Sequence, residues 1–178
     1  VVVLLVAFVL LRLQSSVPQT ELLAESRQQV SLPDGSTIDL QAGSLIRYAK
    51  EEWETEREVF MEGEAYFDVE KGEKFEINLK QGKVTILGTT FQITEKEDTL
   101  HVTCFSGKVK VQAFGYEETL TPGQSITAIK DFRPLVSQTA LTQPIWLSDN
   151  VQLQEVPLAQ VLAQLEEIYG IQFQGIYD

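Results

Sequence analysis

The sequence predicts a mainly β protein: a multi-stranded β domain, β-helix-like or a sandwich, followed by the start of a small α+β domain. Apolar and polar residues alternate in short runs between about residues 21 and 140. Successive side chains of a strand point to opposite faces, so this alternation indicates half-buried strands. Glycine-containing turns separate the runs. No proline lies between Pro33 and Pro122, which leaves every backbone N–H of the runs free to pair in a sheet. We therefore predict a β domain over residues 30–140.

The alternating runs identify the side chains expected in the core. They are Ala65, Phe67 and Val69; Val84 and Ile86; Leu100, Val102 and Cys104; and Val109, Val111 and Ala113. Turn signals between the runs include Pro33-Asp34-Gly35, Gln81-Gly82-Lys83 and Ser106-Gly107-Lys108. Glycine adopts positive φ without steric cost, so each of these signals predicts a tight reversal. Many short strands at this spacing are typical of a sandwich, a barrel or a β-helix-like coil, and spacing does not choose among them.

A helical pattern appears near the C-terminus. Its apolar stripe consists of Leu158, Val161, Leu162, Leu165, Ile168 and Tyr169. Pro157 suits the first turn of this helix and Gly170 suits its end. The short apolar segments Val151–Leu153 and Ile171–Phe173 flank it. The order of strand, helix and strand predicts the truncated opening of a second, α+β domain over residues 145–178.

The N-terminus carries an unbroken apolar run, Val1–Leu11, which ends at Arg12. The run is shorter than the roughly 20 residues that cross a bilayer. It also lacks the basic region that precedes the apolar core of a signal peptide. We therefore expect part of a transmembrane helix over residues 1–13 and a membrane-proximal segment over residues 14–29. The alternative is a buried core helix or a first strand.

The charge balance argues against nucleic acid as a partner. The formal net charge is -12, and no cluster of Lys and Arg supplies a basic face. The densest acidic run is expected to be a solvated turn or strand edge. It consists of Glu51, Glu52, Glu54, Glu56 and Glu58. The single cysteine, Cys104, cannot form an intramolecular disulfide and is expected to be a small buried apolar side chain.

The search for catalytic chemistry is largely negative, and we predict no catalytic, cofactor-binding or metal-binding residue. The only histidine, His101, lies opposite Leu100 and Val102 on an alternating run and has no ligand partner at metal-site spacing. Paired carboxylates suit glycoside hydrolysis. Glu62 and Glu64, with Asp68 nearby, are the candidates, because residues two apart on one strand share a face. We keep a carbohydrate-active enzyme as a weak alternative on this ground.

Several segments, in this order and spacing, resemble the FecR family. They are LPDGSTIDLQAGSLIRY (Leu32–Tyr48), REVFMEGEAYFDVEK (Arg57–Lys71), VTILGTTFQI (Val84–Ile93), SGKVKV (Ser106–Val111) and LTPGQ (Leu120–Gln124). The trailing segment Pro157–Phe173 looks like the start of the short secretin/TonB-type N-terminal domain that follows in many members. The sequence departs from the family pattern at Gln41, Gln92 and Gln124, and none of these positions is a turn glycine.

The resemblance implies a single-pass inner-membrane protein whose β-rich domain lies in the periplasm. It implies two protein partners: the N-terminal signalling domain of a TonB-dependent outer-membrane receptor, and a sigma factor of the extracytoplasmic-function class. The sigma factor would bind a cytoplasmic segment missing from this sequence, and regulatory proteases would release it. Val1–Leu11 would anchor the chain in the membrane. The resemblance implies no enzymatic activity and no cofactor.

Partner binding is expected at the strand-helix-strand segment, because a short exposed strand can pair with an extended segment of another protein. The candidate protein-binding residues are Val151, Leu153, Leu158, Ile171 and Phe173. A non-enzymatic β-rich adhesion or scaffold module of the cell envelope is the main alternative to a signalling role.

Overall fold

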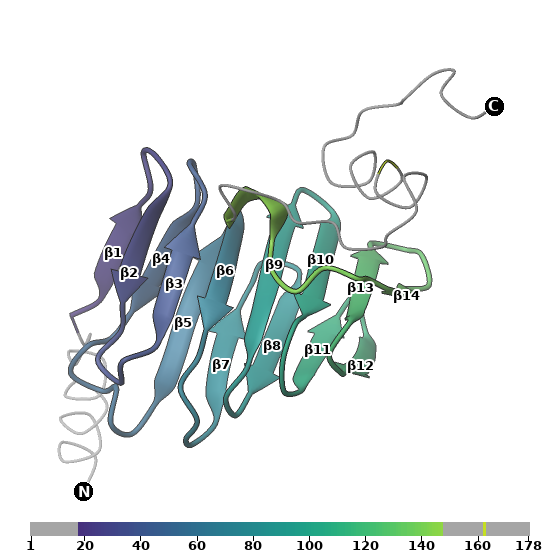
Figure 1. Cartoon of the computed structure of the whole chain (residues 1–178). Helices are drawn as coiled ribbons and strands as arrows, with labels where there is room; N and C mark the ends of the chain where they lie inside the picture. Colours follow the sequence, from purple (N-terminus) through teal and green to yellow (C-terminus); the bar gives the residue numbers. More distant parts are fainter. Residues whose placement is uncertain (1–17, 148–161, 163–178) are drawn as a thin grey trace, which may run out of the picture. The chain divides into compact units, whose positions relative to one another are not determined.

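The computed structural model describes residues 18–147 and Leu162, and it shows two seven-stranded sheets (Figure 1). The first sheet contains, in spatial order, β1 (Thr20–Leu23), β4 (Leu45–Tyr48), β5 (Arg57–Glu62), β7 (Phe75–Asn78), β8 (Gly82–Ile86), β11 (Val109–Ala113) and β12 (Tyr116–Leu120). The second contains β2 (Gln28–Ser31), β3 (Thr37–Leu40), β6 (Glu64–Asp68), β9 (Thr90–Lys96), β10 (Thr99–Cys104), β13 (Gln124–Ile129) and β14 (Leu135–Gln138). A short 3-10 helix, η1 (Ile145–Leu147), follows.

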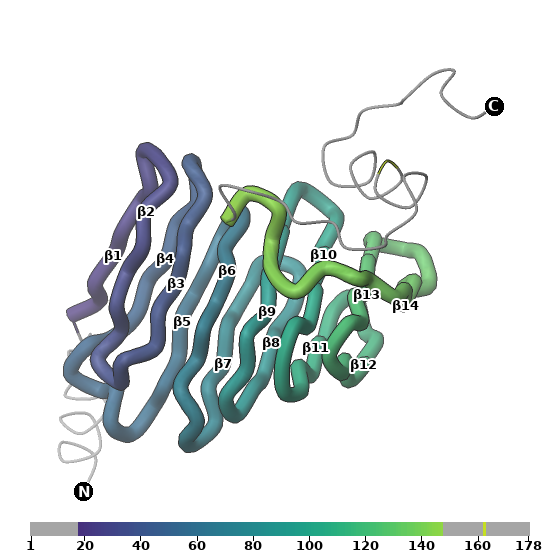
Figure 2. The backbone as a smooth tube through the Cα atoms, in the orientation of Figure 1, coloured from purple at the N-terminus to yellow at the C-terminus, as the bar shows by residue number. Residues whose placement is uncertain are grey.

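The chain adds strands to both sheets in sequence order. It alternates between the sheets, mostly two strands at a time, so strand numbers rise steadily from one end of each sheet to the other (Figure 2). All strand pairs are antiparallel except β5 with β7. The prediction of a mainly β domain is confirmed. The strands pair into two separate sheets, so the architecture is a sandwich. As in a β-helix-like coil, however, the chain progresses from one end of the sheets to the other.

One face of each sheet forms the core. Every side chain that the alternation placed inside is buried, including Phe67, Val84, Val102 and Val111. Phe67 and Phe91 of the second sheet stack with ring centroids 4.9 Å apart. Side chains from both sheets belong to one continuous apolar cluster, so the two sheets pack face to face. This burial is the main source of stability, because apolar area removed from water contributes roughly 25 cal/mol per Å².

The outward faces of the two sheets differ in character. The registers align a row across the first sheet that carries a charge or an amide at every position except Phe60. The row is Glu21, Arg47, Phe60, Asn78, Lys83, Gln112 and Glu117. Ion pairs such as Lys83 with Glu76 link this face across strands. The corresponding row of the second sheet is uncharged except for one residue: Gln29, Asp39, Tyr66, Gln92, Thr103, Ser125 and Ser137. Hydroxyl and amide bonds dominate there, as between the Ser125 and Ser137 side chains at 2.8 Å.

The predicted glycine turns hold at Gly35 and Gly107, where φ is 87° and 71°. Gly82 differs, because it begins β8 and has no positive φ. A Cβ atom there would lie 1.9 Å from the carbonyl oxygen of Gln112 on the neighbouring strand β11. Gly82 is thus required by the close approach of two backbones and not by the reversal itself.

Two predicted segments lie outside the described residues: the partial transmembrane helix and nearly all of the α+β domain. In the part of the chain that the structure describes, no helix has the length and apolar character needed to cross a membrane. The chain divides into two compact units, residues 1–143 and 144–178, and both sheets belong to the first.

We expect Gly82→Ala to lower the free energy of unfolding by about 3 kcal/mol, because backbone atoms of β8 and β11 must separate to admit the methyl group. Gly115→Ala is the control. It places a residue at φ 83° but meets nothing within 4 Å, so about 1 kcal/mol is expected from the backbone conformation alone. Urea unfolding of both variants tests the prediction, and an equal or smaller loss in Gly82→Ala would contradict it.

Candidate functional site

The five predicted protein-binding residues lie outside the described residues. They are Val151, Leu153, Leu158, Ile171 and Phe173. The described residues offer two other features, a groove at one end of the β sandwich and the edges of its sheets.

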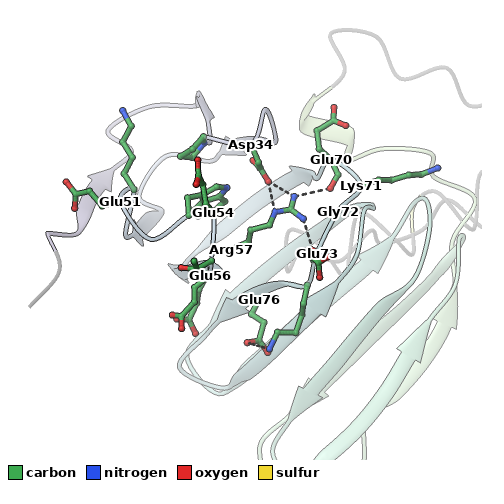
Figure 3. A pocket seen from close by; sticks show the side chains of 16 residues that line it. Asp34, Glu51, Glu54, Glu56, Arg57, Glu70, Lys71, Gly72, Glu73 and Glu76 are labelled. Carbon is green, nitrogen blue, oxygen red and sulfur yellow. Dashed lines mark hydrogen bonds and ion pairs between the residues drawn. The ribbon is translucent and has the colours of Figure 1, made fainter. Parts of the chain in front are cut away.

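A groove with a volume of about 930 Å³ lies where β5 begins (Figure 3). Three connections form its walls: the turn between β2 and β3, the loop between β4 and β5, and the loop between β6 and β7. The predicted acidic turn lies here, and Glu51, Glu54 and Glu56 on it are exposed. The groove thus brings together the LPDGS turn and the start of REVF, segments whose order supported the family resemblance.

Arg57 lies at the centre of this groove, and most of its guanidinium N–H groups donate hydrogen bonds within the protein. Its Nε donates to Asp34 Oδ2 at 2.8 Å, and one terminal nitrogen also donates to that oxygen. That same terminal nitrogen donates to the carbonyl of Glu70 at 3.0 Å, and the other terminal nitrogen donates to the carbonyl of Glu73 at 2.7 Å. Figure 3 shows these bonds converging on one side chain. Through these bonds Arg57, at the start of β5, ties the β2–β3 turn to the β6–β7 loop.

The LPDGS turn is built to receive this arginine. The Ser36 backbone N–H donates to Asp34 Oδ1 at 3.0 Å, and the Ser36 hydroxyl donates to Asp34 Oδ2 at 2.9 Å. The same hydroxyl accepts from the Glu70 N–H at 3.0 Å. Burial by itself raises the pKa of Asp34, but the bonds from Arg57 and Ser36 outweigh burial and leave that pKa below its ordinary value. Asp34 is therefore a firmly ionised structural residue.

Three aromatic side chains in edge contact pack beside the groove. Trp53 is 3% exposed, and its ring meets Tyr48 and Phe75 edge-on, with centroids 5.5 and 5.6 Å away. The Arg57 guanidinium lies 5.3 Å from the Phe75 ring centroid. Such contacts add to burial by about 0.5–1.5 kcal/mol per aromatic pair. The loop between β4 and β5 is thus anchored by Trp53 although its carboxylates face water.

A second cross-connection joins QAGS of the first family segment to GEAYF of the second. The Ser44 hydroxyl donates to the Glu64 carbonyl at 2.8 Å and accepts from the Glu64 N–H at 2.9 Å. Gly63 has φ 96°, and a Cβ atom there would lie 2.9 Å from the Ser44 Cα. Glycine and serine are therefore needed where the chain crosses from β5 to β6.

The carbohydrate-enzyme alternative assumed that Glu62 and Glu64 share one face of one strand, and this assumption is wrong. Glu62 ends β5 in the first sheet, whereas Glu64 begins β6 in the second, so they do not share a strand or a face. Glu62 forms an ion pair with Lys80. Glu64 accepts a hydrogen bond from Gln92 at 2.8 Å. Asp68 is exposed at the end of β6.

The other two residues considered for chemistry, His101 and Cys104, contact neighbouring groups of the sandwich. The ring nitrogens of His101 lie 2.9 and 3.1 Å from the hydroxyls of Thr127 and Thr103, on the outward face as predicted. Burial raises the pKa of the Cys104 thiol to about 11, so it is a protonated, buried side chain. Among residues 18–147, no group of three or more His, Cys, Asp or Glu side chains is placed to hold a metal ion.

Sequence reasoning missed an exposed apolar hairpin formed by β13 and β14. Its four large exposed side chains are Ile129, Phe132, Leu135 and Val136. β14 is the last strand of its sheet, and consecutive side chains on it are exposed on both faces. The segment lacks alternation and contains Pro134, so pattern analysis did not mark a strand there. An edge of this kind can accept an added strand from another chain.

We expect Asp34→Asn to lower the free energy of unfolding by about 3 kcal/mol at pH 7, since it leaves a nearly buried guanidinium without its charged partner. The folded-state pKa of Asp34 is lowered, so its contribution is present above the unfolded value of about 3.9 and is lost as pH falls through the folded value. The gap between wild type and variant should therefore close below about pH 4. Urea unfolding from pH 3 to 7 measures it.

Glu117→Gln is the matched control for this measurement, because Glu117 pairs with Lys110 on an exposed strand. It should change stability much less than Asp34→Asn at every pH. A gap for Asp34→Asn that is the same at pH 3 and pH 7 would contradict the assigned role.

Two solved structures of a proposed anti-sigma factor from Parabacteroides distasonis ATCC 8503 are similar to this chain. One is 29% identical with a TM-score of 0.68, and the match covers 86% of this chain and 76% of that one. The other is also 29% identical with a TM-score of 0.67, and it covers 85% of this chain and 75% of that one. No curated protein gives a significant match.

The family model described as FecR protein matches residues 19–110. That range contains the Asp34–Ser36–Arg57 cluster, the Ser44–Glu64 connection and most strands of the sandwich. The resemblance drawn from the order of the sequence segments is thus confirmed. Because the match spans more than half of the 178 residues, this chain belongs to the FecR family.

Proposed function

We propose that this chain is the envelope-side part of a membrane-anchored anti-sigma regulator. It relays the state of a TonB-dependent outer-membrane receptor to a sigma factor of the extracytoplasmic-function class. The observation that carries the proposal is family membership, joined to similarity over 86% of the chain with a protein described as an anti-sigma factor. In this proposal Val1–Leu11 anchors the chain in the inner membrane, and the sandwich lies in the periplasm.

The described surface supports a role in binding and not in catalysis. The central arginine of the groove and the carboxylate beside it are committed to each other. The outward-facing His101 lies against two threonine hydroxyls. We therefore propose a non-enzymatic protein that works through protein partners and needs no cofactor.

The proposed signal passes from partner docking to the membrane-proximal segment. The receptor's signalling domain binds the segment over residues 145–178, for which the sequence predicts a strand-helix-strand order. Binding changes the access of regulatory proteases to residues 14–29, which precede and begin the first strands of the sandwich. The sandwich lies between the two regions in the sequence, and strands of both its sheets share one packed core.

Binding of the receptor domain tests the proposal directly. The full chain, immobilised, is titrated with the N-terminal signalling domains of the organism's TonB-dependent receptors. One domain should bind, and Leu153→Arg with Phe173→Arg should weaken that binding at least tenfold, which corresponds to about 1.4 kcal/mol. Leu135→Arg with Val136→Arg, on the exposed strand β14, is the matched control and should leave binding unchanged.

If the control pair weakens binding and the first pair does not, docking occurs at the β14 edge and the assigned site is wrong. If no signalling domain binds, the receptor proposal fails. Transcription from a sigma-dependent promoter, measured with and without the regulator gene, tests the sigma-factor part separately. Transcription that does not depend on the gene would overturn that part.

A further inference from the structure

Glu95 is a carboxylate in a core position. It lies on β9 with Phe91 and Ile93, whose side chains face the interior, and it is 6% exposed. A buried charge is costly unless it is fully paired. The sequence pattern gives no reason for an acidic residue at the end of this apolar series, so its contacts deserve a physical explanation.

The contacts of Glu95 join the two sheets at one corner of the sandwich. Its Oε1 accepts from the Gln81 N–H at 3.1 Å, in the turn between β7 and β8 of the first sheet. Its own N–H donates to the Gly63 carbonyl at 2.8 Å, where the chain crosses from β5 to β6. The Gln81 side-chain amide also donates to the Glu97 carbonyl at the end of β9. A strand of the second sheet is thereby fastened to a turn of the first.

This corner contains two buried acceptor atoms that lack a donor. Among the residues that the structure describes, neither Glu95 Oε2 nor the side-chain oxygen of Gln81 has a hydrogen-bond partner. A proton on Glu95 would remove the buried charge and supply a donor at this corner. Burial and the unpartnered Oε2 thus favour the protonated acid, whereas the bond from the Gln81 N–H favours the carboxylate.

The charged groups facing Glu95 act against each other. Glu62 on β5 and Lys80 in the β7–β8 turn lie beside it, and these two form an ion pair. Desolvation by burial is the largest influence and raises the pKa of Glu95. The backbone N–H groups of Gln81 and Lys80 lower this pKa, the charge of Glu62 raises it, and the charge of Lys80 lowers it. The resulting pKa is raised above the ordinary value.

We propose that the Glu95 corner is a proton-sensitive clamp, which holds the β7–β8 turn against β9 when Glu95 is protonated and loosens when Glu95 ionises. The proposal is independent of the receptor and sigma-factor assignment, because it rests only on contacts within the sandwich. It gives the fold a means of coupling the acidity of its surroundings to the order of one inter-sheet corner.

The direction of the pH effect follows from linkage. The folded-state pKa is raised, so the stabilisation from Glu95 is fully present below the unfolded value of about 4.3. It is lost as pH rises through the higher folded value. Replacement by glutamine keeps an acceptor for the Gln81 N–H, adds a donor and removes the ionisation. Glu95→Gln should therefore behave like the protonated wild type at every pH.

Hydrogen exchange of the full chain tests the clamp at residues 79–83. Protection factors, corrected for intrinsic exchange, are measured from pH 4.5 to pH 8 in wild type, Glu95→Gln and the exposed control Glu118→Gln. In wild type and in the control, protection of the Gln81 amide should fall severalfold as pH rises. In Glu95→Gln it should stay constant and high. A flat profile in wild type, or a parallel fall in Glu95→Gln, would overturn the proposal.

The titration of Glu95 itself gives a second, independent measurement. Carbon NMR of its side-chain carboxyl should show a midpoint above that of an ordinary glutamate, which is about 4.3. The midpoint should coincide with the pH at which protection of the Gln81 amide falls. A midpoint at or below the ordinary value would refute the proposal even if Glu95→Gln proved poorly folded.

Discussion

The structure depends on burying one face of each sheet against the other while the chain repeatedly passes between them. Apolar side chains at every second position satisfy the first demand, and they merge into one core. The second demand is harder, because each passage turns backbone polar groups away from sheet pairing. The residues that solve it are few and specific. Ser44 and Gly63 serve the crossing into β6, Asp34 and Arg57 tie together connections around β5, and Glu95 fastens β9 to a turn of the opposite sheet.

These contacts give the small and polar residues of the family segments a structural role. The aspartate and serine of LPDGS orient an arginine that lies 23 positions further along the chain from that aspartate. The serine of QAGS closes on the backbone beside GEAYF. In each case the side chain's hydrogen-bonding capacity is used within the fold. The surface that the described residues leave open includes the outward sheet faces and the sheet edges.

The parts of the fold that could be predicted from the sequence are those with local causes. Alternation identified Phe67 and Val102 as core because the period of two belongs to a single strand. The choice between a coil and a sandwich depends on which strands pair, and alternation carries no information on pairing. The same limit explains the error over Glu62 and Glu64, since Gly63 between them moves the chain to another sheet. The expected docking residues, such as Leu153, lie outside the described part, and the exposed β13–β14 hairpin was missed because its apolar residues do not alternate.

The steady order of strands along the sandwich has a mechanical consequence. β1 is an edge strand of four residues that pairs only with β4, and it is the first strand after residues 1–17. Tension applied through that leading segment would load this short ladder before any other. An edge strand is held by hydrogen bonds on one side only, whereas the interior strands are held on both sides. β1 would therefore detach before the other strands, and the remaining strands of both sheets would stay paired.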